Sequence, residues 1–171
     1  MRHMLIVLVI VLGAILVGAG LYFYGPEEIR DAQVRPSASV ASAQIPFQVI
    51  AEGENAAEVT ERKNYAVYSE EDFAELWRMA YGATSTLPRV DFAQNYVIAV
   101  FAGEKTTGGH DIEVEDIEDT EVVRKVSIAL TRPGAGCMTT QALTRPFQIV
   151  VVPASDLQLA REEAEIEVAC Q

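Results

Sequence analysis

The chain has 171 residues, a length suited to one compact domain, and 50% of them are hydrophobic. Its 25 acidic residues outnumber its 13 lysines and arginines, which gives a formal net charge of −12 at pH 7. Nucleic acids and anionic lipid surfaces bind proteins through neutralisation of phosphate groups, so this charge balance argues against both as partners of the domain.

An apolar run, MLIVLVIVLGAILVGAGLYFY, occupies residues 4–24 and contains no charged residue. A helix of about 20 apolar residues is long enough to cross the hydrocarbon core of a bilayer. Arg2 precedes the run and Glu27 follows it, so the positive-inside rule places the N-terminus in the cytoplasm. A cleaved signal peptide is the alternative, but the best small-x-small cleavage site, residues 41–43, lies far beyond the run. We therefore expect residues 1–25 to be a single-pass anchor in the cytoplasmic membrane, with the rest of the chain outside.

Residues 26–46 combine small and polar side chains with prolines, a composition typical of a flexible spacer. The sequence after them shows no internal repeat and no second composition that would indicate another domain. It predicts a linker at 26–46 and one extracytoplasmic domain over residues 47–171.

Two predicted strands, FQVIA at 47–51 and YAVY at 65–68, precede the clearest element of the domain, a helix. Ser69 is placed to act as its N-cap, with Asp72 as the reciprocal capping residue. Gly82 is placed to end it in the left-handed conformation. The apolar stripe with spacing i, i+3, i+4 and i+7, which we expect to face the core, consists of Phe73, Leu76, Trp77 and Ala80.

The continuously apolar stretch YVIAVFAG, residues 96–103, predicts a central strand that is covered on both faces. Residues 111–115 alternate between apolar and acidic side chains, and residues 123–131 alternate in a similar way. Matching the two apolar faces predicts an antiparallel hairpin whose loop has an odd number of residues. This register sets Glu115 opposite Lys125.

FQIVVVP, residues 147–153, predicts a buried strand that ends at a proline. Residues 155–168 are ambiguous, with a short helical turn from Ser155 followed by an edge strand through Ile166 and Val168. Together the elements predict an α+β fold: a largely antiparallel sheet of about six strands with one amphipathic helix, preceded by the transmembrane helix.

Groups suited to catalysis are scarce in this sequence. His3 flanks the apolar run and His110 is the other histidine, so neither a Ser-His-Asp triad nor a zinc site is well supported. The stretch GEKTTGG, residues 103–109, lacks the earlier glycine of the phosphate-loop pattern and leads into a strand rather than a helix. The acidic side chains within 111–115 share one strand face, unlike calcium ligands that surround a point. We therefore expect no enzymatic activity, no cofactor and no metal.

Two loops between apolar strands are candidate contact surfaces, because loops held by a rigid sheet often carry binding residues. One contains TTGGH and the other is the Gly-, Pro- and Thr-rich excursion over residues 132–146. The alternative interpretation is that both are only turns between strands. The candidate partner-binding residues are Thr106, Thr107, Gly108, Gly109, His110, Arg132, Gln141 and Arg145.

Cys137 and Cys170 face an oxidising compartment if the predicted topology holds, and a disulfide can persist there. Their pairing would close a long loop and stabilise the fold by about 3–4 kcal/mol in the chain-entropy model. Two free buried thiols are the alternative.

The motifs YSEEDFAELW, YVIAVFAGEKTTGGHDIEV and VVRKVSIALTRPGAGCMTTQALTRPFQIVVVP, in this order, resemble the C-terminal domain of the PrcB proteins over residues 47–153. The most specific pieces are Phe-Ala-Gly followed by Thr-Gly-Gly, and Pro-Gly-x-x-Cys followed by Gln-Ala and an aromatic strand. PrcB proteins are accessory subunits of a bacterial surface protease complex. The resemblance implies a non-enzymatic extracytoplasmic module that binds or stabilises a protease or another envelope protein. The family usually has an aromatic or similar residue after the double glycine, where this chain has His110.

KTTGG and TRPF are also similar to loops of the chagasin-type inhibitors of cysteine proteases, which insert loops of a β-sandwich into the active-site cleft. Lys105 replaces the proline of that pattern, and His110 follows Gly109 where an aromatic residue is expected sooner. A loop-inserting protease inhibitor and a small structural domain of the cell envelope are therefore the two alternative functions.

Overall fold

The computed structural model describes residues 42–170. The predicted anchor at 1–25 and most of the predicted linker at 26–46 lie outside this range. Within residues 42–170, no helix has both the length and the apolar character needed to cross a membrane.

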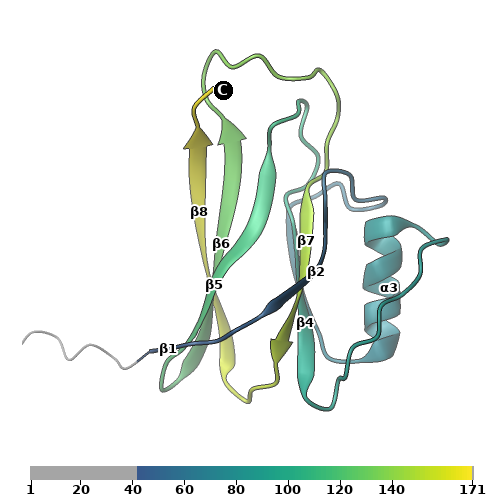
Figure 1. Ribbon diagram of the computed structural model, residues 1–171, viewed down its shortest axis with the longest axis vertical. Helices are drawn as coiled ribbons and strands as arrows, with labels where there is room; N and C mark the ends of the chain where they lie inside the picture. Colours follow the sequence, from purple (N-terminus) through teal and green to yellow (C-terminus); the bar gives the residue numbers. More distant parts are fainter. Residues whose placement is uncertain (1–41, 171) are drawn as a thin grey trace, which may run out of the picture. The chain divides into compact units, whose positions relative to one another are not determined.

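Two four-stranded β-sheets form the fold (Figure 1). The helix-covered sheet has the strand order β2-β7-β4-β3, and the second sheet has the order β1-β5-β6-β8. The elements are β1 (Ala43–Gln44), β2 (Gln48–Gly53), β3 (Lys63–Val67), α3 (Glu70–Tyr81), β4 (Asn95–Phe101), β5 (Asp111–Asp119), β6 (Val123–Pro133), β7 (Phe147–Pro153) and β8 (Gln158–Val168). The prediction of one sheet of about six strands is therefore wrong in strand number and in layering. The predicted amphipathic helix and the largely antiparallel pairing are confirmed.

Helix α3 covers the outer face of the helix-covered sheet (Figure 1). Ser69 is its N-cap in an extended conformation, and its side chain accepts a hydrogen bond from the Asp72 N–H at 3.2 Å. Gly82 ends the helix at a φ of +79°, which residues with a Cβ rarely adopt. The predicted stripe is buried against the sheet, with Phe73, Leu76, Trp77 and Ala80 all in one apolar cluster. Local sequence signals thus placed this helix correctly.

The second apolar cluster fills the space between the two sheets. It contains Ile98 and Val100 from β4, Ile112 from β5 and Ile128 from β6. Strand β4 contributes alternate residues to both clusters, so Asn95–Phe101 is covered on both faces as its continuous apolar sequence predicts. The two sheets and the helix therefore share β4 as the central strand of the core.

The β5–β6 hairpin differs from the predicted register. Near its open end Val114 pairs with Ile128, which matches the apolar faces as expected. A β-bulge between Val114 and Asp116 then shifts the pairing, so Lys125 lies opposite Glu118 instead of Glu115. An extra residue in one strand shifts every pair beyond it by one residue. The alternating pattern alone does not reveal where that residue is inserted.

The two ends of the domain also differ from the prediction. Residues 158–168 form one long strand, β8, parallel to β6, and the helical turn expected from Ser155 is absent from the described structure. At the other end, β1 lies inside the range assigned to the linker and pairs with Glu118 and Asp119. The predicted edge strand through Ile166 and Val168 is confirmed as the end of β8. The first part of β8 and all of β1 gain their order from neighbours distant in sequence, so local composition did not predict them.

Candidate functional site

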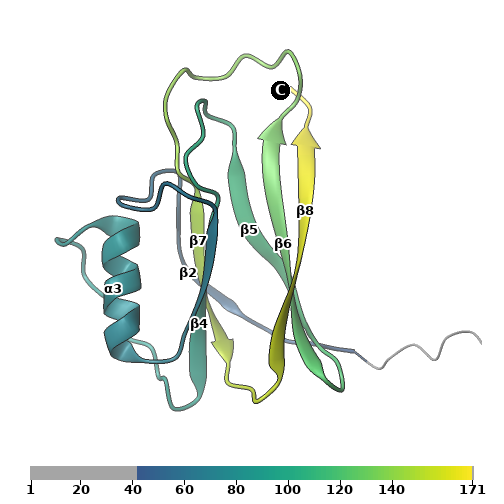
Figure 2. The same cartoon turned by 180° about the vertical axis from the view of Figure 1, so that it is seen from behind.

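The two candidate loops lie side by side at one end of the sandwich, named here the loop end and formed by residues 102–110 and 134–146 (Figures 1 and 2). Lys105 and Thr144 exchange two backbone hydrogen bonds, with N···O distances of 2.8 and 3.0 Å. Gly108 donates its N–H to the Thr140 carbonyl at 3.0 Å, and the Thr144 hydroxyl donates to the Thr107 carbonyl at 3.1 Å. The folded chain therefore joins the two loops into one surface.

The double glycine is needed for this close approach. Gly108 is buried, and a Cβ at its position would lie 2.3 Å from the Thr140 hydroxyl oxygen. Gly109 has a φ of +83°, in the region that favours glycine. Gly108 and Gly109 thus shape the surface and do not themselves present side chains to a partner.

The remaining candidate residues differ in how accessible they are. Thr106 and Gln141 are exposed, whereas Thr107 is half-buried. Arg132 forms an ion pair with Glu167 at 2.9 Å, and Arg145 pairs with Glu104 at 2.6 Å. Both guanidinium groups are therefore already engaged within the chain, although exposed pairs of this kind are weak enough to exchange partners.

His110 is half-buried beside the double glycine. Burial lowers the pKa of its imidazole below the ordinary value, and the positive charges of Lys105 and Arg132 lower it further. The side chain is therefore a neutral donor and acceptor at pH 7 rather than a cation.

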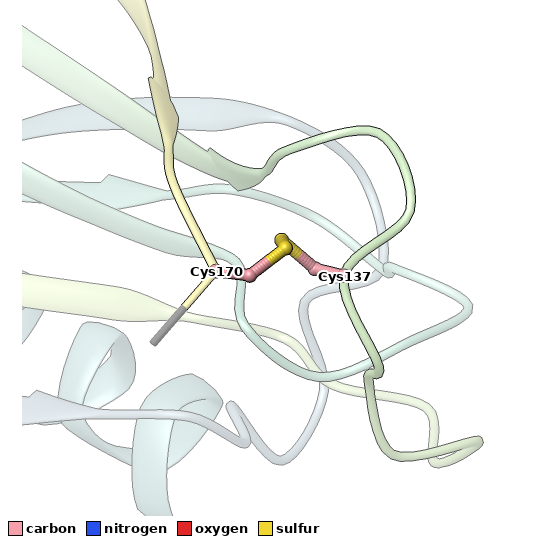
Figure 3. The surroundings of a disulfide bond; sticks show 2 residues. All are labelled: Cys137 and Cys170. Atoms are coloured by element: carbon pink, nitrogen blue, oxygen red, sulfur yellow. A yellow bond between two sulfur atoms is a disulfide. The ribbon is translucent and has the colours of Figure 1, made fainter.

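Cys137 and Cys170 form a disulfide with a Cα–Cα distance of 5.2 Å (Figure 3). The bond ties the 134–146 loop to the end of β8, as Figure 3 shows. It limits the conformations open to this loop, which lowers the entropy that a partner must remove on binding.

Sequence reasoning missed two exposed apolar side chains in the long loop. Met138 is fully exposed and Leu143 is 58% exposed. Beside Met138 lies a surface hollow of about 510 Å³ lined by Pro133, Thr139 and Val168, among others. The sequence did contain a signal for them, namely apolar residues within a Gly- and Thr-rich stretch. A turn that only connects two strands does not need exposed apolar side chains.

A second hollow, the acidic groove, lies between the end of β2 and the start of β5 and has a volume of about 350 Å³. Its lining residues are Glu52, Gly53, Glu54, Gly109, His110, Asp111, Ile112, Glu113 and Gln148. Across residues 42–170, no three His, Cys, Asp or Glu side chains are grouped closely enough to hold a metal ion.

The TRPF loop does not have the geometry of an inserting inhibitor loop. Pro146 and Phe147 are buried, and the Phe147 ring stacks on Phe101 with ring centroids 5.7 Å apart. An aromatic residue that forms part of the core cannot enter the cleft of a protease without unfolding the start of β7. The structure thus argues against the chagasin-like interpretation of this loop.

In comparisons with known proteins, residues 96–153 match the family model described as PrcB C-terminal. No curated protein and no solved structure gave a match. The matched segment runs from β4 to β7, so it includes both loops of the loop end, the β5–β6 hairpin and the two central strands of the helix-covered sheet. Residues 96–153 of the chain are therefore similar to the PrcB C-terminal family.

Proposed function

We propose that this PrcB C-terminal-like domain is a non-enzymatic protein-binding module that associates with a protease complex or another envelope protein through its loop end. The observation that carries the proposal is the union of the two loops by backbone hydrogen bonds between Lys105 and Thr144 and between Gly108 and Thr140. Turns that only connect strands do not need to pair with each other. A preformed two-loop surface loses little conformational entropy when a partner binds.

The chemistry of the loop end supports the same conclusion. Met138 and Leu143 expose apolar side chains on the loop that also exposes Gln141, and Thr106 is exposed on the loop that pairs with it. Protein interfaces typically combine an apolar centre with a polar rim. Methionine is well suited to such a centre, because its flexible side chain adapts to the partner's shape.

The apolar run at 4–24 supports a location at the membrane. We propose that residues 1–25 anchor the chain in the cytoplasmic membrane and that the domain lies outside it, joined to the anchor by the linker. In that compartment the Cys137–Cys170 disulfide is compatible with the redox conditions. PrcB accessory subunits, which the chain resembles, are surface proteins, so they too lie in a compartment where a disulfide can persist.

The test is crosslinking of the full-length protein in its native membrane, followed by purification and mass spectrometry. We expect a protease or another envelope protein in near-equal amount from the wild type. A Met138→Glu/Leu143→Glu double variant should lose that partner, because charges at the centre of an apolar contact resist burial. Its unfolding midpoint should stay unchanged, since both side chains are exposed in the free domain.

Val122→Glu is the matched control. Val122 is also apolar and 73% exposed, but it lies in the β5–β6 turn at the opposite end of the sandwich. Partner recovery should survive this change. Equal recovery from the double variant and the wild type would contradict the proposal, and recovery of the wild-type protein alone would favour a structural envelope domain.

A further inference from the structure

The acidic groove lies where the second sheet lacks a neighbouring strand. Strand β1 pairs only with Glu118 and Asp119, at the far end of β5. The first half of β5 therefore has no described strand on this side. The Val114 N–H points toward the groove side and is satisfied by a side chain, Gln148 Oε1, at 2.9 Å. The groove thus lies beside the part of β5 that has no described neighbouring strand, and it has a volume of about 350 Å³.

Gln148 lines the groove and is only 6% exposed. Its carbonyl oxygen accepts from Val114 N, whereas its amide nitrogen Nε2 makes no hydrogen bond to any described residue. Nε2 is not among the fully buried unpaired atoms, and Gln148 is part of the groove lining. A nearly buried amide held by one oxygen presents its donor in a fixed direction, which suits a carbonyl oxygen of a ligand.

The rim of the groove is rich in carboxylates. Glu52, Glu54, Asp111 and Glu113 line it, and none of them forms an ion pair with a described lysine or arginine. The glutamates of β8 differ in this respect, because Arg62, Lys125 and Arg132 pair with them. An open rim of carboxylates attracts a complementary cation.

The spacing of these carboxylates distinguishes between kinds of cation. They do not form a group close enough to hold a metal ion. A guanidinium group is planar and has five N–H donors, so it can reach several separated carboxylates at once. An arginine residue also brings a backbone carbonyl, which is the acceptor that Gln148 Nε2 lacks.

We propose that the acidic groove binds an arginine side chain carried on an extended segment of the partner protein. The guanidinium lies among Glu52, Glu54, Asp111 and Glu113, and Gln148 Nε2 donates to a backbone carbonyl of the same segment. Gly109 and His110 belong to both the groove lining and the loop end. The arginine therefore binds at the edge of the surface through which the loop end contacts the partner. This inference rests on the proposed function and specifies the chemistry of the partner.

The test uses the full-length chain in detergent and three small probes, followed by calorimetric titration. The first probe is N-acetylarginine N-methylamide, which has both the cation and the backbone carbonyls. The second is the citrulline analogue, which has nearly the same shape without the charge. The third is propylguanidinium, which has the charge without a backbone carbonyl. We expect the arginine probe to bind at least tenfold more tightly than either of the others, and less tightly at high salt.

Variants locate the binding. The Glu52→Gln/Glu113→Gln variant removes two charges from the rim. It should weaken the binding of the arginine probe at least tenfold. Glu75→Gln on the exposed face of α3 removes one charge elsewhere and should have no effect. Equal affinity for the arginine and citrulline probes, or an unaltered affinity in the rim variant, would overturn the inference.

The same titration separates this inference from the proposed function. Crosslinked partner in the membrane without arginine binding in the groove would overturn only the groove assignment. Arginine binding that depends on Glu52 and Glu113 supports the groove assignment, whatever the result of the crosslinking experiment. If the Met138→Glu/Leu143→Glu variant retains its partner, the loop end is not the contact surface.

Discussion

Arg124 at one end of the sandwich and the acidic groove near the other end differ in how their charged groups are paired. At the hairpin end, formed by the β5–β6 turn and the end of β7, Arg124 is 2% exposed. It donates to both carboxylate oxygens of Asp119, to the Pro153 carbonyl and to the Tyr96 hydroxyl. Near the loop end, the carboxylates of the acidic groove form no ion pair with a described lysine or arginine, and Gln148 Nε2 donates to no described acceptor.

This difference separates charges that serve the fold from charges that remain available to a ligand. A guanidinium whose donors are used inside the protein cannot bind anything else, and its loss damages the fold. Carboxylates on an open rim add little to stability, but they attract a complementary cation. Substitutions at the hairpin end should therefore act on stability, and substitutions at the groove should act on binding.

Replacing Arg124 should give the largest loss of stability. Arg124→Leu leaves the Asp119 carboxylate without its cation and the Pro153 carbonyl without a donor. Removing one partner of a buried ion pair typically costs about 3–5 kcal/mol. Chemical denaturation of the full-length chain in detergent measures this loss, and a change below about 1 kcal/mol would show that the hairpin end does not depend on the pair.

The same pair predicts a specific acid dependence. The hydrogen bond from Arg124 is the main cause that lowers the pKa of Asp119, and the folded carboxyl therefore holds its proton less tightly than the unfolded one. Its stabilisation is fully present above the ordinary aspartate pKa and is lost as the pH falls below that value. Unfolding measured across this acid range should show the loss in the wild type, and the Arg124→Leu variant should lack that component.

Removing the disulfide should have the next largest effect. Cys137 and Cys170 are 33 residues apart, so the Cys137→Ser/Cys170→Ser variant should lose about 3–4 kcal/mol in the chain-entropy model. Hydrogen exchange should increase first in the 134–146 loop and at the end of β8, which the bond connects. If exchange rises equally in β4, the bond stabilises the whole core and not specifically the loop end.

A methyl group at Gly108 tests the union of the two loops. The new Cβ would approach the Thr140 hydroxyl to 2.3 Å, whereas the Thr140 Cβ would remain 3.7 Å away. Gly108→Ala should therefore cost about 1–3 kcal/mol through overpacking. The Gly108→Ala/Thr140→Ala variant removes the clashing oxygen and should recover most of this loss, as measured in a double-mutant cycle. Simple additivity of the two changes would mean that the loops are not in contact there.

The smallest effect is expected at Arg145. Its ion pair with Glu104 is partly exposed, with side chains 30% and 37% accessible. Arg145→Met keeps most of the aliphatic packing and should cost about 0.5 kcal/mol in thermal unfolding, with less difference at high salt. A loss as large as that of Arg124→Leu would remove the distinction between the two ends.

The elements that the sequence determined by itself are those with local causes. Helix α3 needs only the Ser69 cap, the spacing of Phe73, Leu76 and Trp77, and a glycine at its end. The inward faces of β5 and β6 follow from alternation, because successive side chains of a strand point to opposite sides. The same reasoning placed the two candidate loops between buried strands, and the order of the motifs resembled the PrcB C-terminal family, whose model matches residues 96–153.

The tertiary structure alone decided which strands share a sheet and which side chains meet. The sequence does not indicate that β8 runs parallel to β6, or that a bulge changes the Lys125 partner from Glu115 to Glu118. It also gives no sign that Glu52 and Glu113, distant in the chain, line one groove with Gln148. These features arise from pairings across long sequence separations, whose energy depends on the burial of complete faces and not on any local pattern. The candidate binding chemistry of this protein is therefore a property of its folded surface.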